Sequence, residues 1–380
     1  MDKEQDILVG FDAKRIVSNS TGLGNYGRTL VNNLQAYGDA RISYRLYAPT
    51  SGKPSLLRQI NENDRTQYVF SQKKSNVGRA LWRSSGIVSD LKRDGIDIYH
   101  GLTGELPRGL RNAGIKGIVT IHDLIFLRYP EYYNWIDVQI YRYKFQLACR
   151  EAERIIAISE CTKRDIMEYG HVSADKIDVI YQDCDNAFKQ KVSSEKLHEV
   201  SVRYQLPNQY ILNVGSIEAR KNVLLAVKAL EGLPDDVHLV IVGKHTAYTD
   251  EVLNYISAHY LERRVMMLHN VPFADLPAIY QLAQAFVYPS RYEGFGIPII
   301  EAIHCGLPIV ACAGSCLEEA GGPDGLYVDP DDVEGMRAAL VDALDNTKRD
   351  IRVARCREYV RRFEAETTTP QMIGEYFNVL

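Results

Sequence analysis

Short apolar runs recur along the chain, and stretches of helical periodicity separate them. The runs are rich in β-branched and aromatic side chains and stop at Gly, Pro, Asp or Ser, so each predicts a buried strand. Strands are expected at 7–11, 42–48, 96–100, 117–123, 154–159, 177–181, 210–215, 239–243, 265–268, 285–288 and 307–311. Helices are expected at 28–37, 135–153, 163–169, 223–230, 277–283, 298–304 and 333–344. This alternation predicts an α/β fold with parallel sheets.

The alternation pauses at the polar segment 189–198 and resumes after Pro207. A length of 380 residues fits two domains. We therefore predict two α/β halves, with the linker inside 189–198. The helix at 135–153 is rich in tyrosines and basic residues, and we interpret it as a solvated face rather than an acceptor- or membrane-facing surface.

Composition and charge exclude several classes of protein. A net charge of −4 gives no pull toward nucleic acid. No apolar run approaches the length of a membrane span, and the charged N-terminus does not resemble a signal peptide. The seven cysteines include no CxxC pair, and Cys312 and Cys316 lack the histidines of a zinc site. We predict a soluble cytoplasmic protein, with peripheral contact at the inner face of a membrane left open.

The segment 285–311 contains a strand, a glycine-broken loop, a helix and another strand. Pro298 suits the first turn of the helix and Gly306 its C-terminal cap. Two carboxylates, Glu293 and Glu301, flank the start of this helix. Acidic side chains are favourable there on electrostatic grounds alone. Because the loop also offers glycines and free N–H groups, we favour a site for a hydroxyl-rich or phosphorylated ligand.

The pattern Gly22-x-Gly24-x-x-Gly27 formally matches the dinucleotide-binding fingerprint. That fingerprint needs its first glycine at the end of a strand and an acid after the second strand. Here residues 13–21 separate the strand from the glycines, and the second strand ends at Pro49 without an acid. A nicotinamide site is therefore rejected. The glycines predict either a loop that binds a phosphate or sugar hydroxyl, or a plain turn into a helix, and the sequence leaves both open.

Two histidines follow strands of the first half, where ligands bind in an open α/β sheet. We interpret His122 as a site residue, whereas for His100 a site role and a core role are evenly balanced. In the second half, Arg220 and Lys221 stand at the start of a helix, where the dipole disfavours cations. A guanidinium beside an ammonium suits a diphosphate, and we favour that site over a solvated basic turn.

Six short motifs together resemble those of one enzyme family. In chain order they are Thr21-Gly22-Leu23-Gly24-Asn25-Tyr26, His122-Asp123-Leu124, Ile156-Ala157-Ile158-Ser159, Gly215-Ser216-x3-Arg220-Lys221-Asn222, Tyr288-Pro289-Ser290-x2-Glu293-Gly294-Phe295-Gly296 and Glu301-Ala302. The sequence resembles the retaining glycosyltransferases of the GT-B fold, in the group 1 family that contains sucrose synthase and many bacterial mannosyltransferases. One motif alone would be weak, but six in the family's order are specific.

The resemblance implies two Rossmann-like domains, each a doubly wound parallel sheet, that face a central cleft. Residues 1–188 would form the N-terminal domain on the acceptor side. Residues 189–362 would form the C-terminal domain that binds the nucleotide sugar. Residues 363–380 would form a helix that crosses back to the N-terminal domain.

The resemblance also implies roles for the matching positions. The donor-binding set would be Gly22, Gly24, Gly215, Arg220, Lys221, Val271, Leu276, Glu293, Phe295, Gly296, Ile297 and Glu301. Arg220 and Lys221 would hold the diphosphate, Glu301 the ribose, and the loop Val271–Leu276 the base. Glu293, with N–H groups of 295–297, would hold the sugar and phosphate. The catalytic set would be Arg220, Lys221, Glu293 and His122, with His122 beside the sugar.

The implied reaction is a front-face transfer in which the leaving phosphate oxygen accepts the proton of the acceptor hydroxyl. Under this interpretation Glu293 and Glu301 are not a glycosidase pair, whose carboxylates act together about 5 Å apart. No metal or other cofactor is expected. The acidic pairs Asp183-x-Asp185 and Asp329-x-Asp331 match a metal–diphosphate signature formally, but they lie in turn-like contexts.

We therefore predict a retaining, metal-independent hexosyltransferase of polysaccharide biosynthesis. The resemblance to bacterial mannosyltransferases suggests GDP-mannose as the donor, with a UDP-hexose next. The acceptor would be a glycan or a lipid-linked oligosaccharide, nucleic acid would not be a partner, and the oligomeric state is open. A nucleotide-sugar epimerase and a non-catalytic sugar-nucleotide sensor are the alternatives from other classes.

Overall fold

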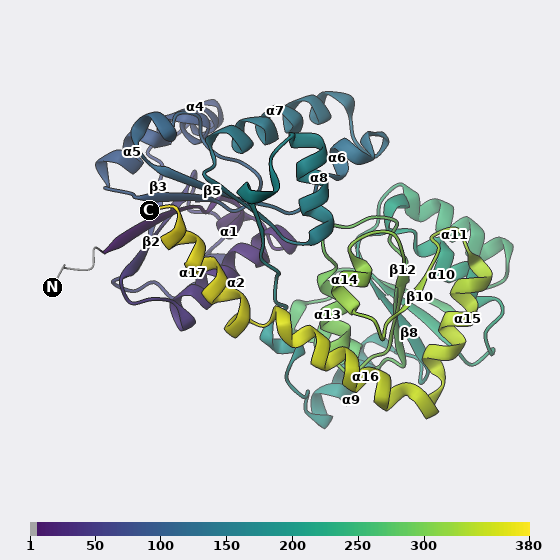
Figure 1. Cartoon of the computed structure of the whole chain (residues 1–380). Coiled ribbons are helices and arrows are strands. Elements are labelled where there is room, and N and C mark those ends of the chain that lie inside the picture. The colour runs from purple at the N-terminus through teal and green to yellow at the C-terminus, as the bar shows by residue number, and fades with distance from the viewer. Residues whose placement is uncertain (1–5) are drawn as a thin grey trace. The chain divides into compact units, whose positions relative to one another are not determined.

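The computed structural model describes residues 6–380, which fold into two compact units (Figure 1). One unit extends to Asp183 and also includes Phe363–Leu380, and the other comprises Cys184–Arg362. The predicted linker at 189–198 is wrong, because this segment lies inside the second unit. There the Ser193 hydroxyl caps helix α9 (Ser194–Tyr204) by accepting a hydrogen bond from the backbone of Lys196.

The first unit is built on a seven-stranded parallel sheet in the order β3-β2-β1-β4-β5-β6-β7. Its strands are β1 (Ile7–Asp12), β2 (Ile42–Ala48), β3 (Thr66–Phe70), β4 (Ile98–Gly101), β5 (Lys116–Ile121), β6 (Arg154–Ala157) and β7 (Ile177–Val179). The strand order reverses direction between β1 and β4, which pair directly. Such a reversal opens a crevice outside the carboxyl ends of the strands, where α/β proteins bind ligands.

Helices cover both faces of this sheet (Figure 1). On one face lie α1 (Lys14–Ser18), α2 (Gly22–Tyr37) and α17 (Ala365–Asn378). On the other lie α4 (Asn76–Leu81), α5 (Ile87–Arg93), α7 (Trp135–Glu151) and α8 (Glu160–Gly170). The short helices α3 (Pro54–Leu57) and α6 (Ile125–Arg128) lie between strands.

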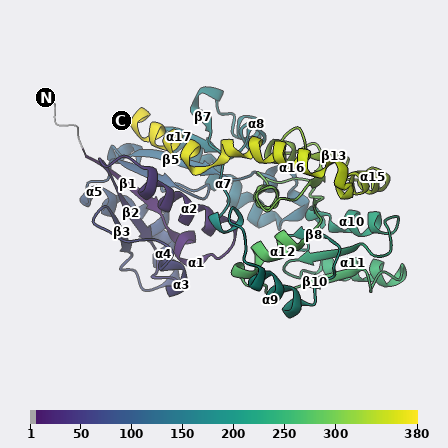
Figure 2. The ribbon, with the colours of Figure 1, turned by 90° about the horizontal axis from the view of Figure 1, so that it is seen from below.

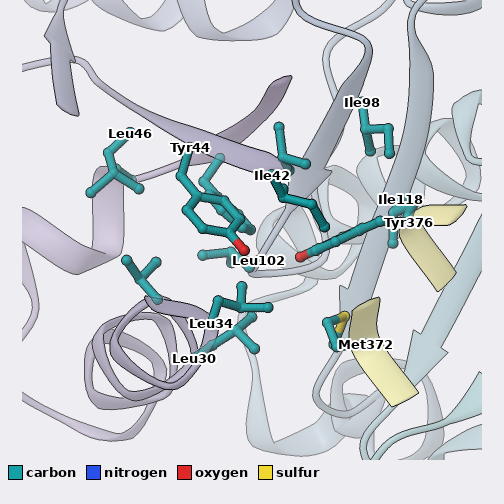
Figure 3. Packing of buried hydrophobic residues seen from close by; sticks show 14 of the residues in the cluster. Leu30, Leu34, Ile42, Tyr44, Leu46, Ile98, Leu102, Ile118, Met372 and Tyr376 are labelled. Carbon is teal, nitrogen blue, oxygen red and sulfur yellow. The ribbon is translucent and has the colours of Figure 1, made fainter. Parts of the chain in front are cut away.

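The core beneath α2 explains why the last helix belongs to the first unit. Leu30 and Leu34, four residues apart, share one face of α2 and pack toward Tyr44 of β2 (Figure 3). Met372 and Tyr376 of α17 complete the same cluster and are themselves buried. Figure 2 shows α17 running beside this unit from a second direction.

The second unit is built on a six-stranded parallel sheet in the order β10-β9-β8-β11-β12-β13. Its strands are β8 (Tyr210–Val214), β9 (His238–Val242), β10 (Val265–Leu268), β11 (Ala285–Tyr288), β12 (Ile309–Cys312) and β13 (Leu326–Val328). Here the order reverses between β8 and β11. The predicted pair of doubly wound parallel sheets is thus confirmed, each with its own reversal point.

Helices cover both faces of the second sheet as well (Figure 1). One face carries α10 (Val223–Leu230), α11 (Tyr248–Ala258) and α15 (Val333–Leu344). The remaining helices are α9, α12 (Leu276–Leu282), α13 (Ile297–His304), α14 (Leu317–Gly321) and α16 (Asn346–Val360). Among residues 6–380, none of the helices combines the length and the apolar character needed to cross a membrane.

Candidate active site

Arg220, Lys221 and Glu293 meet at the reversal point of the second sheet. The loop after β8 carries both cations in a 3-10 turn just before α10, and the loop after β11 carries the carboxylate. Glu293 Oε1 lies 2.9 Å from Arg220 Nη1 and 2.5 Å from Lys221 Nζ. One carboxylate oxygen therefore pairs with two cations, and a second, more exposed carboxylate, Glu218 Oε2, lies 3.7 Å from Arg220 Nη2.

Tyr288, the last residue of β11, supports the same three residues. Its hydroxyl accepts a 2.7 Å hydrogen bond from Lys221 Nζ, and the ammonium lies 5.0 Å from the ring centroid. The backbone carbonyl of Tyr292 accepts a 2.6 Å bond from Arg220 Nη1. In the sequence Tyr288 stands out only as part of a motif, although its place at the carboxyl end of a strand beside the reversal point is a usable signal.

Burial and charge act in opposite directions on these groups. Burial alone would raise the pKa of Glu293, but the Lys221 and Arg220 charges outweigh it and hold that pKa below its ordinary value. Burial would lower the pKa of Lys221, but Glu293 and Tyr288 raise it. All three side chains are therefore charged at neutral pH. The side chains of Arg220, Lys221 and Glu293 are only 14%, 17% and 12% exposed. The two cations are thus poorly solvated, and among residues 6–380 Glu293 is the one mostly buried carboxylate that pairs with both of them, which favours an anionic ligand.

Glu301 lies on α13 and has a different set of neighbours. Its Oε2 accepts a 2.8 Å hydrogen bond from the hydroxyl of Tyr280. Burial raises the pKa of Glu301 to about 7, a shift that Tyr280 opposes and the charge of Asp185 reinforces. Burial thus shifts the pKa of Glu301 upward, whereas the two cations hold that of Glu293 down.

The loop between these glutamates is shaped by glycine. Gly296, at φ +117, precedes α13, and an added Cβ there would come within 3.0 Å of Leu317. Phe295 is buried, and Ile297 opens the helix with Pro298 in its first turn. Backbone N–H groups of 295–297 therefore stand at a helix N-terminus, the geometry that suits a phosphate or a sugar hydroxyl.

The remaining donor-binding candidates of this unit lie at other strand ends. Gly215 follows β8, and its N–H donates to Val242 O over 2.9 Å. In the loop Val271–Leu276, Asp275 is buried and pairs with Lys196 and Arg203 of α9, each at 2.7 Å. This part of the loop anchors α9, and Leu276 already belongs to α12.

His122 lies at the carboxyl end of β5 in the first unit. Its Nε2–H donates to Leu102 O over 2.8 Å, and its Nδ1 accepts from the amide of Gln182 over 3.1 Å. Tyr26 packs edge-on against the ring at 4.7 Å. Burial lowers the pKa of His122 to about 4. The imidazole is therefore neutral at physiological pH, suited to hydrogen bonding rather than to supplying a charge.

His100 is a core histidine. It is fully buried between Tyr376 Oη, at 3.0 Å from Nδ1, and Thr120 Oγ1, at 2.9 Å from Nε2. Burial lowers its pKa to about 3. Of the two interpretations left open by the sequence, the structure favours the core role.

The glycine pattern 22–27 lies inside α2 rather than in a loop before it. The predicted helix start at Arg28 is wrong, because the helix begins at Gly22. A Cβ on Gly24 would lie 1.9 Å from Asn19 O, and one on Gly27 would lie 2.7 Å from Ile16. These two glycines allow α2 to pack closely on the preceding segment, whereas an added Cβ on Gly22 meets nothing within 4 Å.

Two members of the acidic pairs with metal-like spacing cap local backbone turns, and the other two bind more distant segments. Asp185 accepts from the N–H of Ala187 over 2.8 Å, and Asp329 accepts from the N–H of Asp331 over 2.9 Å. Asp331 forms an ion pair with Arg291, and Asp183 accepts from Ala365 N–H over 3.0 Å. Each carboxylate thus has a structural partner.

Comparison with known proteins adds independent support. A family described as glycosyl transferases group 1 matches residues 195–363, and glycosyltransferase family 4 matches residues 20–183. O-antigen chain mannosyltransferase B of Escherichia coli is 33% identical over 377 residues, covering 94% of this chain and 96% of that protein. O-antigen chain mannosyltransferase RfbU of Salmonella typhimurium is 28% identical over 261 residues, covering 68% of each.

Solved structures share the fold over nearly the full length. Anabaena Alr3699/HepE in complex with UDP and glucose aligns with a TM-score of 0.75 at 20% identity, covering 98% of this chain and 100% of that one. Sucrose-phosphate synthase from Thermosynechococcus elongatus aligns with a TM-score of 0.78 at 20% identity, covering 98% of each chain.

Proposed function

The chain belongs to the glycosyl transferases group 1 family, and we propose that it transfers a hexose with retention of anomeric configuration and without a metal ion. It is a glycosyltransferase of polysaccharide biosynthesis, in keeping with its similarity to O-antigen mannosyltransferases along most of the chain.

The observation that carries the proposal is the positive group formed by Arg220, Lys221 and Glu293. A donor diphosphate brings oxygens that can replace Glu293 as partners of the two cations. Glu293 would then turn to the hydroxyl groups of the donor sugar. The ion pairs with Glu293 hold both cations in place, which limits the reorganisation needed when the diphosphate binds.

The chemistry breaks the bond between the anomeric carbon and the leaving phosphate oxygen. Negative charge develops on that oxygen, and Arg220 and Lys221, whose side chains are mostly buried, stabilise it. The acceptor hydroxyl attacks the same face of the sugar and gives its proton to the departing phosphate oxygen. Glu293 is held by two cations and Glu301 by Tyr280, so we assign neither as a covalent nucleophile.

We propose that a divalent metal is not required, because two fixed cations offset much of the charge of the leaving diphosphate. We assign Glu301 to the ribose hydroxyls and the loop Val271–Leu276 to the base. Gly22 and Gly24 are assigned to the donor phosphate, and His122 to the donor sugar as a neutral hydrogen-bonding group.

GDP-mannose is the proposed donor because mannosyltransferases predominate among the relatives. A UDP-hexose is the second candidate, since a UDP-Gal:alpha-D-GlcNAc-diphosphoundecaprenol alpha-1,3-galactosyltransferase of Escherichia coli is 27% identical over 327 residues. The proposed acceptor is a glycan or a lipid-linked oligosaccharide, reached at the inner face of the membrane.

A thermal-shift screen tests the donor. Ligands that bind the folded state raise the unfolding midpoint, so GDP and GDP-mannose should raise it more than UDP, ADP and their sugars. The product made from the stabilising donor is then analysed by proton NMR, which distinguishes a retained from an inverted anomeric centre. An inverted product, or an epimerised sugar formed without acceptor, would refute the proposed reaction.

A further inference from the structure

The reversal point of the first sheet also carries a group of charged side chains. Asp12 ends β1, and Arg83 Nη2 lies 2.7 Å from its Oδ2. Arg83 Nη1 lies 2.6 Å from Glu105 Oε2, and Lys144 Nζ lies 3.1 Å from Glu105 Oε1. Glu105 belongs to the loop after β4, so the residues come together where β1 and β4 diverge. We call Asp12, Lys14, Arg83, Glu105 and Lys144 the β1–β4 cluster.

Lys14 gives this cluster its excess positive charge. The three cations Lys14, Arg83 and Lys144 face only two carboxylates, Asp12 and Glu105. Across residues 6–380, the ion pairs of the cluster leave the Lys14 ammonium without a carboxylate of its own. Lys14 is nevertheless half-buried, at the start of α1. The backbone N–H of Lys14 donates to Asp12 Oδ1 over 3.2 Å, which places this residue next to the Asp12–Arg83 ion pair.

The surroundings of Lys14 disfavour its charge. Burial lowers the pKa of Lys14, and the Arg83 charge lowers it further, although Glu105 and Asp12 oppose the shift. Arg15 is a further like charge that acts in the same direction. An anion bound between these side chains would relieve both effects, since it would give the ammonium a partner and reduce repulsion among the cations.

We propose that the β1–β4 cluster binds a phosphate or diphosphate group of the acceptor. Lys14 and Lys144 contact the anion directly. Arg83 is held from both sides by Asp12 and Glu105, so it fixes the geometry and contributes positive potential. Binding of the anion follows from the first unit alone, whereas its assignment to the acceptor rests on the proposed transferase function.

The acceptor then enters the site with its anionic group fixed at a topological switch point. In open α/β sheets this is where ligands bind, and the second unit uses the corresponding point for its own positive group. Fixing the anion anchors the acceptor, and no bond at the anion changes during the reaction. Lys14 and Lys144 are therefore binding residues, and their loss should raise KM for a phosphorylated acceptor more than it lowers kcat.

Inorganic pyrophosphate is the probe for the binding test, titrated calorimetrically with a chelator present. Arg220→Ala combined with Lys221→Ala removes the group in the second unit and isolates the first. In this background we expect Lys14→Met to weaken pyrophosphate binding about tenfold and Lys144→Met to weaken it by a similar factor. Lys92→Met, on an exposed position of α5, is the matched control for loss of one positive charge.

Unchanged affinity in both Lys14→Met and Lys144→Met, with unfolding midpoints equal to that of the parent, would overturn the proposal. If the Arg220→Ala, Lys221→Ala double variant binds pyrophosphate as tightly as the wild type, the proposed donor site is refuted. The Lys14→Met and Lys144→Met variants still test the β1–β4 cluster in that case. The acceptor assignment is checked with a matched pair of acceptors, one with and one without a diphosphate. Lys14→Met should raise KM only for the former, and an equal rise for both would refute this assignment.

Discussion

The two reversal points of this protein share a topology and a group of partly buried cations but differ in how these cations are held. In the second unit, two adjacent residues place both cations on one carboxylate oxygen. In the first, the cations come from three distant segments, and Arg83 is fixed between two carboxylates. In the second unit, both cations can exchange their carboxylate partner for the oxygens of a leaving group. The first is better suited to holding a group that does not react.

The largest expected effect is on kcat, and it should distinguish Lys221, which acts on the chemical step, from Lys14, which acts on acceptor binding. Lys221→Met removes a cation from the leaving diphosphate, and we expect kcat to fall about 10²–10³-fold, as when one preorganised donor to a transition-state charge is lost. Lys14→Met should leave kcat within about threefold. Steady-state kinetics of both variants with one acceptor provide the comparison. A similar fall in kcat for both variants would mean that the reversal points of the two sheets do not differ in function.

A second prediction concerns stability in the first unit. Asp12 is buried, and although burial alone would raise its pKa, Arg83 holds that pKa below its ordinary value. Asp12→Asn should therefore lower the free energy of unfolding by about 3 kcal/mol, because it removes a buried ion-pair partner. Urea denaturation at pH 7 measures this loss, and Asp39→Asn, at a surface ion pair, is the control with a smaller expected effect.

Asp12 and Glu301 should make opposite contributions to the pH dependence of the protein's stability. Asp12 has a lowered folded-state pKa, so its stabilisation is present above its ordinary pKa and is lost as pH falls through the folded value. Glu301 has a pKa raised to about 7 by burial, so the folded state binds the extra proton. Its contribution therefore declines as pH rises from its ordinary pKa to about 7, by about 3 kcal/mol in total.

Denaturation curves between pH 5 and 8 test the Glu301 prediction, with Glu301→Gln as the matched variant. The glutamine keeps the shape and cannot ionise, so the variant should lose the decline in stability across this range. If wild type and Glu301→Gln show the same pH dependence, Glu301 ionises normally and its proposed environment is wrong.

The smallest expected effect belongs to Tyr288. Tyr288→Phe keeps the ring beneath Lys221 but removes the hydroxyl that accepts its hydrogen bond. Loss of one such bond should lower kcat/KM about fivefold, corresponding to ~1 kcal/mol. Steady-state kinetics measure it, and an effect as large as that of Lys221→Met would mean that Tyr288 itself contacts the reacting groups.

Much of the fold was readable from sequence because its strands are buried on both faces and form continuous apolar runs. The strand β3 (Thr66–Phe70) was missed, since an edge strand is half exposed and alternates with polar residues. The helix α9 was interpreted as a linker because its outward face is polar. The packing of α17 on the first unit depends on Met372 and Tyr376, which local patterns do not connect to α2.

The site residues could be predicted where all the evidence for them lies within one short sequence motif. Arg220 and Lys221 oppose a helix dipole, and that conflict is visible without a structure. Their pairing with Glu293, in contrast, requires β8 and β11 to be neighbours. The β1–β4 cluster was missed altogether, because Asp12, Arg83 and Lys144 are far apart in sequence and meet only through the sheet order.

The central claim is that Arg220 and Lys221 bind the diphosphate of the donor. Calorimetric titration of GDP and of guanosine into wild type and into the Arg220→Ala, Lys221→Ala double variant tests it directly, with UDP and uridine in parallel. We predict that the double variant binds the nucleoside diphosphate about a hundredfold more weakly than the wild type does. Its affinity for the matching nucleoside should be unchanged. Equal diphosphate affinity in both proteins would contradict the claim.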